Sequence, residues 1–153
     1  MLQLQSYLQL AEIMKSNPES LILEFYTQTF RVPSLAAAAT STVISNIDQS
    51  AYFVWCKTTY SATIANAAQT DSSRVVPLVT VQLTDSGSQR QLFDAPQPIP
   101  NIAGFAGIPQ LLEQPYLFKP NSNVSGSFTS FDAAATYANL YLTLIGYRVK
   151  AYG

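Results

Sequence analysis

The sequence predicts an all-β domain, an antiparallel β-sandwich or barrel of about eight strands that follows a helical arm. Short runs rich in β-branched and aromatic residues recur along the chain, and such runs are typical of β-strands. Gly, Pro, Asn and Asp separate these runs about every ten residues, a spacing typical of sandwiches and barrels. The 153 residues suit one domain, which we divide into an arm, residues 1–19, and a β-domain, residues 20–153.

The first segment has the spacing of an amphipathic helix. Its apolar face holds Leu4, Tyr7, Leu8, Ala11 and Met14. Asn17 and Pro18 end the helix, because proline disfavours helical geometry in the residue before it. Two interpretations stay open: the helix packs on its own domain, or it is an arm that docks on a neighbouring subunit.

Three strands are predicted in the first half, over residues 21–32, 42–47 and 51–60. Pro33 is expected to end the first of them. Residues 61–73 are small and polar, which favours a long loop.

The second half is predicted to begin with a hairpin of residues 74–84 and 88–93. Pro77 would place the first of these strands at an edge or in a bulge. In the turn between them, Asp85 would bond the backbone and Gly87 would take a positive φ. The proline-dense passage from Pro96 to Pro120 is expected to hold only short strands.

Two more strands are predicted, over residues 124–131 and 137–152, with a turn at 121–123 and a loop at 132–135. The last strand alternates leucines with Tyr141, Thr143, Ile145, Tyr147 and Val149. Because both of its faces are largely apolar, we expect it to be a central strand that is covered on both sides.

The composition excludes several classes of chemistry. Histidine is absent, which removes the commonest general base and metal ligand. The single cysteine, Cys56, lies in a strand-like run and is interpreted as a packing residue. The nine acidic residues are scattered, mostly beside turn residues. We therefore predict a protein that is not an enzyme and has no catalytic, cofactor-binding or metal-binding residues.

Charged residues make up only 11% of the chain, against about 25% in an average soluble domain. Either much of the surface is neutral and polar, or much of it is buried against other chains. The net charge is −1 with no cluster of Lys and Arg, so nucleic-acid binding is not expected. No apolar run approaches the roughly 20 residues of a membrane span, so no membrane association is expected.

The C-terminal half resembles the small jelly-roll decoration or cement proteins on the heads of tailed bacteriophages. The residues that carry the resemblance, in order, are Asp85-Ser86-Gly87, Pro98, Gly104, Gly107-Ile108-Pro109, Leu112, Pro115-Tyr116-Leu117-Phe118-Lys119-Pro120-Asn121-Ser122 and Leu142-Thr143-Leu144-Ile145-Gly146-Tyr147-Arg148-Val149. The resemblance covers roughly residues 75–152 and implies a β-sandwich of jelly-roll type. Pro115 and Pro120 fix φ on either side of Tyr116 and Phe118, so that the two rings can anchor a strand in the core.

The resemblance also implies a function. A decoration protein is a structural, non-enzymatic component of the virion. It is made in the bacterial cytoplasm, sits on the capsid exterior, and stabilises the assembled shell. The implied partners are the major capsid protein and further copies of the chain itself, as a dimer or a trimer. The candidate capsid or subunit contacts are Leu4, Tyr7, Leu8, Ala11 and Met14 of the arm and Pro98, Pro100, Phe105 and Pro109 of the proline-dense passage.

The alternative is a jelly-roll module that binds a carbohydrate or a receptor, for example a tail or baseplate component. Exposed Tyr60, Tyr116, Tyr137 or Tyr152 could stack on sugar rings. Two or three coplanar exposed rings in a groove would favour this glycan-binding alternative.

Overall fold

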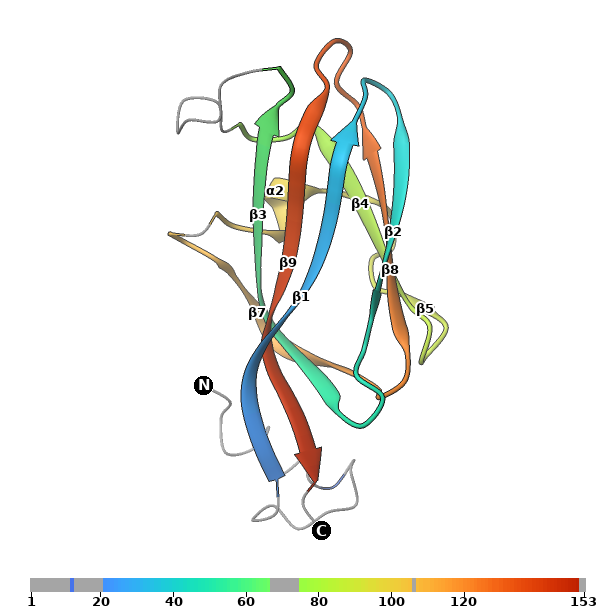
Figure 1. Cartoon of the computed structure of the whole chain (residues 1–153), viewed down its shortest axis with the longest axis vertical. Helices are drawn as coiled ribbons and strands as arrows, with labels where there is room; N and C mark the ends of the chain where they lie inside the picture. Colours follow the sequence, from blue (N-terminus) through green and yellow to red (C-terminus); the bar gives the residue numbers. More distant parts are fainter. Residues whose placement is uncertain (1–11, 13–20, 67–74, 106, 152–153) are drawn as a thin grey trace.

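The computed structural model describes residues 12, 21–66, 75–105 and 107–151. Within these ranges the chain forms nine strands and one short helix (Figure 1). The elements are β1 (Leu21–Leu35), β2 (Thr40–Asn46), β3 (Tyr52–Ile64), β4 (Val79–Asp85), β5 (Arg90–Gln91), β6 (Gln97–Pro98), α2 (Ile99–Ile102), β7 (Gln110–Phe118), β8 (Asn123–Ser130) and β9 (Tyr137–Ala151). The predicted all-β class with two antiparallel sheets is confirmed. The predicted arm, residues 1–19, lies outside the described residues apart from Glu12.

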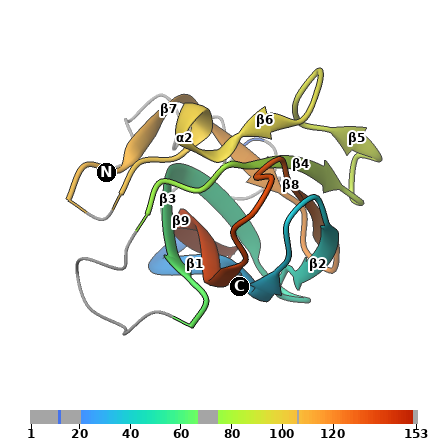
Figure 2. The same cartoon turned by 90° about the horizontal axis from the view of Figure 1, so that it is seen from above.

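The strands form two sheets that enclose a common interior (Figure 2). Sheet one has the order β1-β9-β3-β7, and sheet two has the order β2-β8-β4-β5, with β6 also paired to β4. Every pair of strands is antiparallel. The pairs are nested, since the first strand pairs with the last, the second with the eighth and the third with the seventh.

The main core lies between the sheets and is almost entirely apolar. Its largest fully buried side chains are Phe30, Phe53, Phe118, Phe128, Leu35, Leu83, Ile99, Leu140, Leu142 and Leu144. The three leucines of β9 face this core, while Tyr141, Thr143, Ile145 and Tyr147 are half-buried on the other face. The predicted central position of the last strand is thus confirmed, with one face more deeply covered than the other.

Tyr116 and Phe118 anchor strand β7 to the core, as the flanking Pro115 and Pro120 predict. Phe118 is fully buried, and its ring stacks on Phe53 and Trp55 with centroid separations of 6.1 and 6.2 Å. The ring centres of Tyr116 and Phe118 lie 4.7 Å apart, and Tyr116 packs at the border of the core. Asn121 has φ 57°, which places the chain reversal after Pro120 where it was predicted.

Two expectations about strand ends were wrong. Strand β1 continues through Pro33 to Leu35, because β1 is an edge strand and a missing backbone N–H costs little there. Strand β3 continues from the predicted end at Tyr60 to Ile64, where it pairs with Tyr137 of β9. The small residues from 61 to 64 are extended because they pair with β9. Local sequence alone does not reveal such a pairing.

The predicted hairpin of residues 74–93 is shorter than expected. Strand β4 begins only at Val79, after Pro77, and its partner β5 has two residues. Asp85 accepts a hydrogen bond from the N–H of Gly87 at 2.9 Å, as predicted. The left-handed residue of the turn is Gln89, with φ 54°, and Gly87 does not have the predicted left-handed φ.

The proline-dense passage contains one strand longer than expected. Strand β7 has nine residues and includes Pro115. Its pairing with β3 shifts between Leu111 and Tyr116, so Pro115 lies in an irregular stretch of an edge strand, where proline is tolerated.

Gly146 of β9 is required by the close approach of β3. A Cβ at this position would lie 1.7 Å from the carbonyl oxygen of Val54. We expect Gly146→Ala to destabilise the domain by about 1–3 kcal/mol or more, because backbone must move to admit the methyl group. Gly107→Ala is the control, since its Cβ would meet only the edge of the Phe105 ring at 3.2 Å. Equal urea midpoints for the two variants would contradict the prediction.

An ion cluster joins β1, β9 and the β2–β3 connection. Arg148 donates to Glu24 at 2.5 Å and to Asp48 at 3.4 Å, and its guanidinium lies 4.9 Å from the ring centre of Tyr26. Arg148 lowers the pKa of Glu24 by hydrogen bonding and by its charge. The pKa of Asp48 is lowered chiefly by the backbone N–H and hydroxyl of Ser50.

Because the pKa of Glu24 is lowered in the folded state, the stability of the fold depends on pH in the acidic range. Because the folded pKa lies below the unfolded one, the stabilisation is complete above about pH 4.3 and is lost as the pH falls through the folded pKa. We expect the stability of Glu24→Gln, measured by urea unfolding, to fall less steeply than that of the wild type below about pH 4. Parallel slopes for the two proteins would show that Glu24 makes no such contribution.

Candidate functional site

The segment between α2 and β7 stands out from the body beside β3 (Figure 1). It joins the edge of β3 through Gly104, whose N–H donates to the Thr58 carbonyl at 3.1 Å and whose carbonyl accepts from Tyr60 N–H at 2.8 Å. The chain then reverses, and the N–H of Ile108 donates to the carbonyl of Phe105 at 2.9 Å. The turn is therefore held by β3 at its base and is free to present side chains at its tip.

Gly104 makes the tight reversal possible. A Cβ on Gly104 would lie 1.9 Å from the carbonyl oxygen of Ile108 and 2.9 Å from the backbone nitrogen of Gln110. No other residue type can bring the two arms of the turn so close. The close approach of Gly104 to the backbone of Ile108 and Gln110 therefore fixes the shape of the turn.

Three large apolar side chains are exposed on and beside this turn. Phe105 is 55% exposed, Ile108 68% and Leu111 62%. We call Phe105, Ile108 and Leu111 the tip patch. Exposed apolar side chains that lie close together mark a candidate contact surface for a partner.

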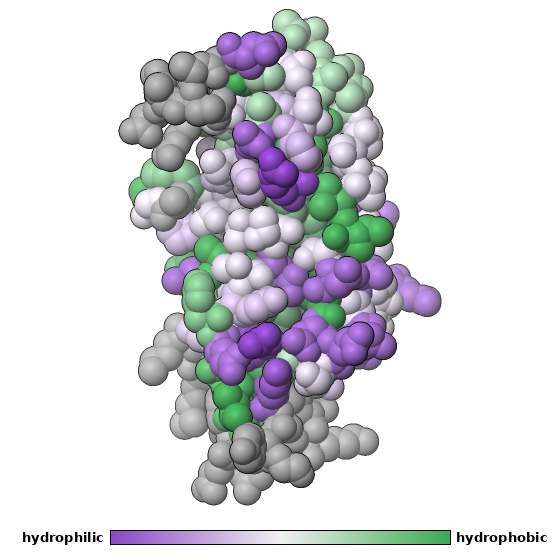
Figure 3. All heavy atoms as spheres, viewed as in Figure 1, coloured by the Kyte–Doolittle hydropathy of each residue, from purple (hydrophilic) through white to green (hydrophobic). Residues whose placement is uncertain are grey.

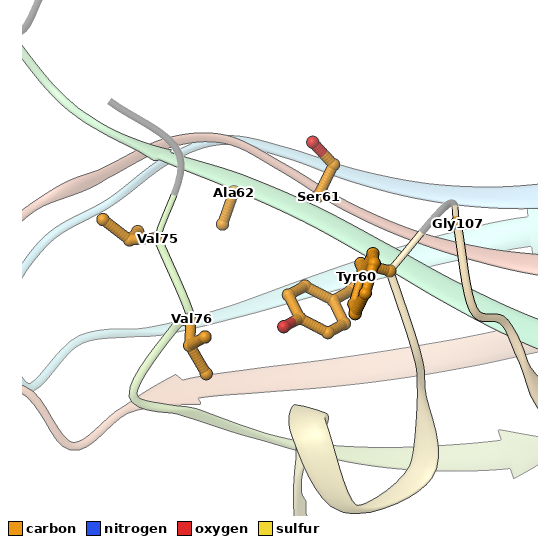
Figure 4. A pocket seen from close by; sticks show the side chains of 7 residues that line it. Tyr60, Ser61, Ala62, Val75, Val76 and Gly107 are labelled. Carbon is orange, nitrogen blue, oxygen red and sulfur yellow. The ribbon is translucent and has the colours of Figure 1, made fainter. Parts of the chain in front are cut away.

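A pocket of about 450 Å³ lies between the tip patch and the segment that leads into β4. Its lining residues are Tyr60, Ser61, Ala62, Val75, Val76, Phe105 and Gly107. Figure 4 shows Val75, Val76 and Ala62 on one side and Tyr60 on the other, with the Tyr60 hydroxyl directed toward Val76. The N–H of Val75 donates to the Ala62 carbonyl at 3.1 Å, so both walls are anchored to β3.

The lining residues are uncharged, and their only polar side-chain groups are the hydroxyls of Tyr60 and Ser61. Such a surface favours apolar contacts with one or two hydrogen bonds. The arrangement suits an apolar side chain of a partner protein that inserts next to Phe105.

The predicted contact residues are only partly brought together. Phe105 belongs to the tip patch, and Pro109 is half-buried beside Ile108. Pro98 is half-buried in β6, where it pairs with Thr80, and Pro100 is exposed in α2. The five predicted arm contacts, Leu4, Tyr7, Leu8, Ala11 and Met14, lie outside the described residues.

Sequence reasoning missed Ile108, Leu111 and Val76 as surface residues. Val76 was assigned to a strand because it stands in a run of apolar residues. Gly104 and Gly107 in the sequence indicate a tight turn near Ile108. They do not indicate which side chains of that turn face solvent.

Among the described residues, the candidates Tyr60, Tyr116 and Tyr137 do not form the platform that sugar stacking would need. Tyr137 is buried, with its hydroxyl bonded to Asp132 at 2.8 Å and to the N–H of Leu78 at 3.0 Å. Tyr116 is half-buried against Phe118. Tyr60 lines the pocket, and Tyr152 lies outside the described residues. Tyr137 was therefore wrong as an exposed candidate.

Among the described residues, no group of three or more His, Cys, Asp or Glu side chains is placed to hold a metal ion. The carboxylate of Asp85 is buried and accepts hydrogen bonds from the Tyr116 hydroxyl at 2.9 Å, the Ser88 hydroxyl at 3.0 Å and Gly87 N–H. Burial is the main cause that raises the pKa of Tyr116. These contacts tie the β4–β5 turn to β7 and account for Asp85 as a structural residue.

Comparison with protein families, with curated proteins and with solved structures finds no match to this chain. In the part of the chain that the structure describes, no helix is long and apolar enough to cross a membrane.

The hydrogen bond from Tyr116 to Asp85 should stabilise the turn measurably. We expect Tyr116→Phe to lower the free energy of unfolding by about 1–3 kcal/mol, because a buried carboxylate loses a donor. Tyr60→Phe is the matched control, with an expected effect below about 0.5 kcal/mol, since its hydroxyl lines an open pocket. Chemical denaturation of both variants tests this, and an effect of Tyr116→Phe no larger than the control's would contradict it.

Proposed function

We propose that this chain is a capsid decoration or cement protein, a non-enzymatic virion component that binds the assembled shell from outside and stabilises it. The observation that carries the proposal is the tip patch. Its three exposed apolar side chains lie on and beside a projecting turn, next to an uncharged pocket. An exposed aromatic anchor next to a pocket is typical of the centre of a protein–protein interface.

The order of the strands supports a jelly-roll fold for this domain. In a jelly roll a long hairpin is wound so that early strands pair with late ones, giving two four-stranded sheets. The orders β1-β9-β3-β7 and β2-β8-β4-β5 follow this nested scheme. Viral capsid proteins and lectins both use this fold, so the topology suits both the capsid function and its glycan-binding alternative.

The character of the surface favours protein contact. Figure 3 shows a face on which hydrophobic side chains form separate patches among neutral and hydrophilic ones. Only 11% of the residues are charged, so a broad contact need not desolvate many ions. Interfaces with few charged residues at their centre bind well for this reason.

An assembled shell presents many identical binding sites, so an oligomer of this chain can bind several of them at once. In a dimer or trimer of this chain, two or three copies of the tip patch can engage neighbouring capsid subunits at once. The second contact is then intramolecular, which raises the overall affinity without any new surface. Dimers and trimers both match the local symmetry axes of an icosahedral shell.

Ile108→Ala tests the proposal in co-sedimentation with purified capsids of the phage that encodes the chain. We expect the variant to bind about five- to tenfold more weakly than the wild type or worse, because a truncated central contact costs more than about 1 kcal/mol. Ile44→Ala is the matched control, since Ile44 is 59% exposed on β2 of the other sheet. It should bind as the wild type does.

Two outcomes would overturn the proposal. Equal binding of Ile108→Ala and the wild type would exclude the tip patch as the contact. A wild-type protein that fails to co-sediment with capsids but binds immobilised glycans would favour the carbohydrate-binding alternative.

A further inference from the structure

Strand β1 is a long edge strand with one side open to a further strand. It has 15 residues and pairs with β9 along its length. Among the described residues, β9 is the only strand that pairs with β1, which stands at the end of the order β1-β9-β3-β7. No turn or loop of the described chain bonds to the backbone of residues 22–28. The second edge of this stretch therefore offers a row of N–H and C=O groups to a partner strand.

Sheet two does not extend along the first half of β1. The hydroxyl of Ser45, near the end of β2, donates to the side-chain carbonyl of Gln28 at 2.6 Å, so β2 ends about opposite Gln28. Residues 22–27 continue past that point together with residues 145–150 of β9 (Figure 1). We call residues 22–28 the open edge. A partner strand can approach the open edge because β2 ends before it.

The open edge lacks two features that usually prevent strand edges from pairing. Its register with β9 is unbroken, and it contains no proline. The other edge strand of sheet one is different, since β7 contains Glu113 and Pro115 and its pairing with β3 is irregular. Prolines, charges and irregular pairing all hinder the addition of a strand. Of the two edges of sheet one, the open edge is thus the one suited to pairing.

The single charged residue of the open edge is compensated within its own chain. Glu24 forms an ion pair with Arg148 of β9. The guanidinium of Arg148 also lies over the ring of Tyr26, 4.9 Å from its centre. A strand that pairs here would therefore not remove an unpaired carboxylate from water, which is the main electrostatic cost of burying a charge.

Apolar side chains on both faces of the open edge are exposed. Phe25 is 72% exposed, Ile22 39% and Tyr26 36%. Side chains alternate along a strand, so Phe25 lies on one face of the sheet and Ile22 and Tyr26 lie on the other. An added strand would cover apolar area on both faces as well as form backbone hydrogen bonds.

We propose that the open edge pairs in the antiparallel sense with the open edge of a second copy of this chain. A two-fold axis at Phe25 places this residue opposite its own counterpart and places Glu24 opposite Tyr26 of the second copy. Opposite residues of an antiparallel pair point to the same face, so the cores of both copies lie on one side of the joined sheet. The two four-stranded sheets then become one continuous sheet.

The open edge is complementary to itself, which is the reason to assign it to a second copy. In the two-fold arrangement the exposed ring of Phe25 meets another apolar ring, and no two like charges stand directly opposite each other. The contact is also closed, because each copy uses its open edge once and no further copy can add there. The inference does not rest on the proposed capsid function, and it selects the dimer from the two oligomers considered there.

Phe25→Lys in the full-length chain tests the proposal by sedimentation velocity over a range of protein concentrations. We expect the wild type to show a monomer–dimer equilibrium. The dissociation constant of the variant dimer should be at least about tenfold higher, because two lysines would stand opposite each other at the axis. Phe131→Lys is the matched control, since Phe131 is 54% exposed and lies just after the end of β8. It should dimerise as the wild type does.

A mixing experiment tests whether the two copies of residue 25 are neighbours. Phe25→Glu alone should weaken the dimer as Phe25→Lys does. An equal mixture of the two variants should recover dimers, because a lysine and a glutamate then face each other across the axis. Recovery in the mixture would also show that both variants are folded.

Several results would overturn the proposal. One is a wild-type protein that stays monomeric up to about millimolar concentration, whether or not it binds an extended peptide. Another is a mixture of the two charged variants that forms no more dimer than either variant alone. A dimer that withstands Phe25→Lys but is lost in Ile108→Lys or Ile44→Lys would assign the contact to the tip patch or to β2 instead.

Discussion

The pairing of the first described strand with the last is the constraint on which the rest of the structure depends. Strand β1 pairs with β9 from Leu21↔Ala151 to Leu35↔Tyr137, along the whole length of both strands. The other edge of β9 pairs with β3, so β9 joins an early and a middle part of the chain into one sheet. Contacts of such high sequence separation form late and slowly in folding. Sheet one is complete only when β1 and β9 are paired, and even their nearest partners, Leu35 and Tyr137, are far apart in the sequence.

This constraint also positions the surfaces that carry the functional proposals. Because β9 and β3 are paired, Gly104 can add to the free edge of β3 beyond the end of β7 and hold the projecting turn. Near the start of β3, the paired β1, β9 and β3 bring Leu23, Val149 and Tyr52 into one row on the outer face of the same sheet. The tip patch leaves the sheet farther along β3, where Gly104 pairs with Thr59. The two surfaces differ in burial, since Val149 is buried, while Phe105, Ile108 and Leu111 are exposed.

Much of the fold could be predicted from local patterns. The alternation of Leu140, Leu142 and Leu144 indicated a central strand, and they are fully buried. Pro115 and Pro120 around the rings of Tyr116 and Phe118 indicated an anchored strand, and Phe118 lies in the core. The errors arose where a neighbouring strand decides the outcome. Pro33 is accepted because β1 is an edge, and residues 61–64 are extended because β9 pairs with them.

The candidate site was less predictable, for a related reason. Phe105 was selected from the proline-dense passage, but Ile108 and Leu111 were not, because exposure depends on where the turn leaves the sheet. Composition and alternation determined by themselves that the chain is all-β, poorly charged and without histidine, since these are properties of each residue and its nearest neighbours. Only the tertiary structure decided which apolar residues form the core, which form the tip patch and which lie on the outer face of sheet one. The side of a strand that is buried depends on what packs against it, and in this fold even the neighbouring strand of a sheet is up to 130 residues away along the chain.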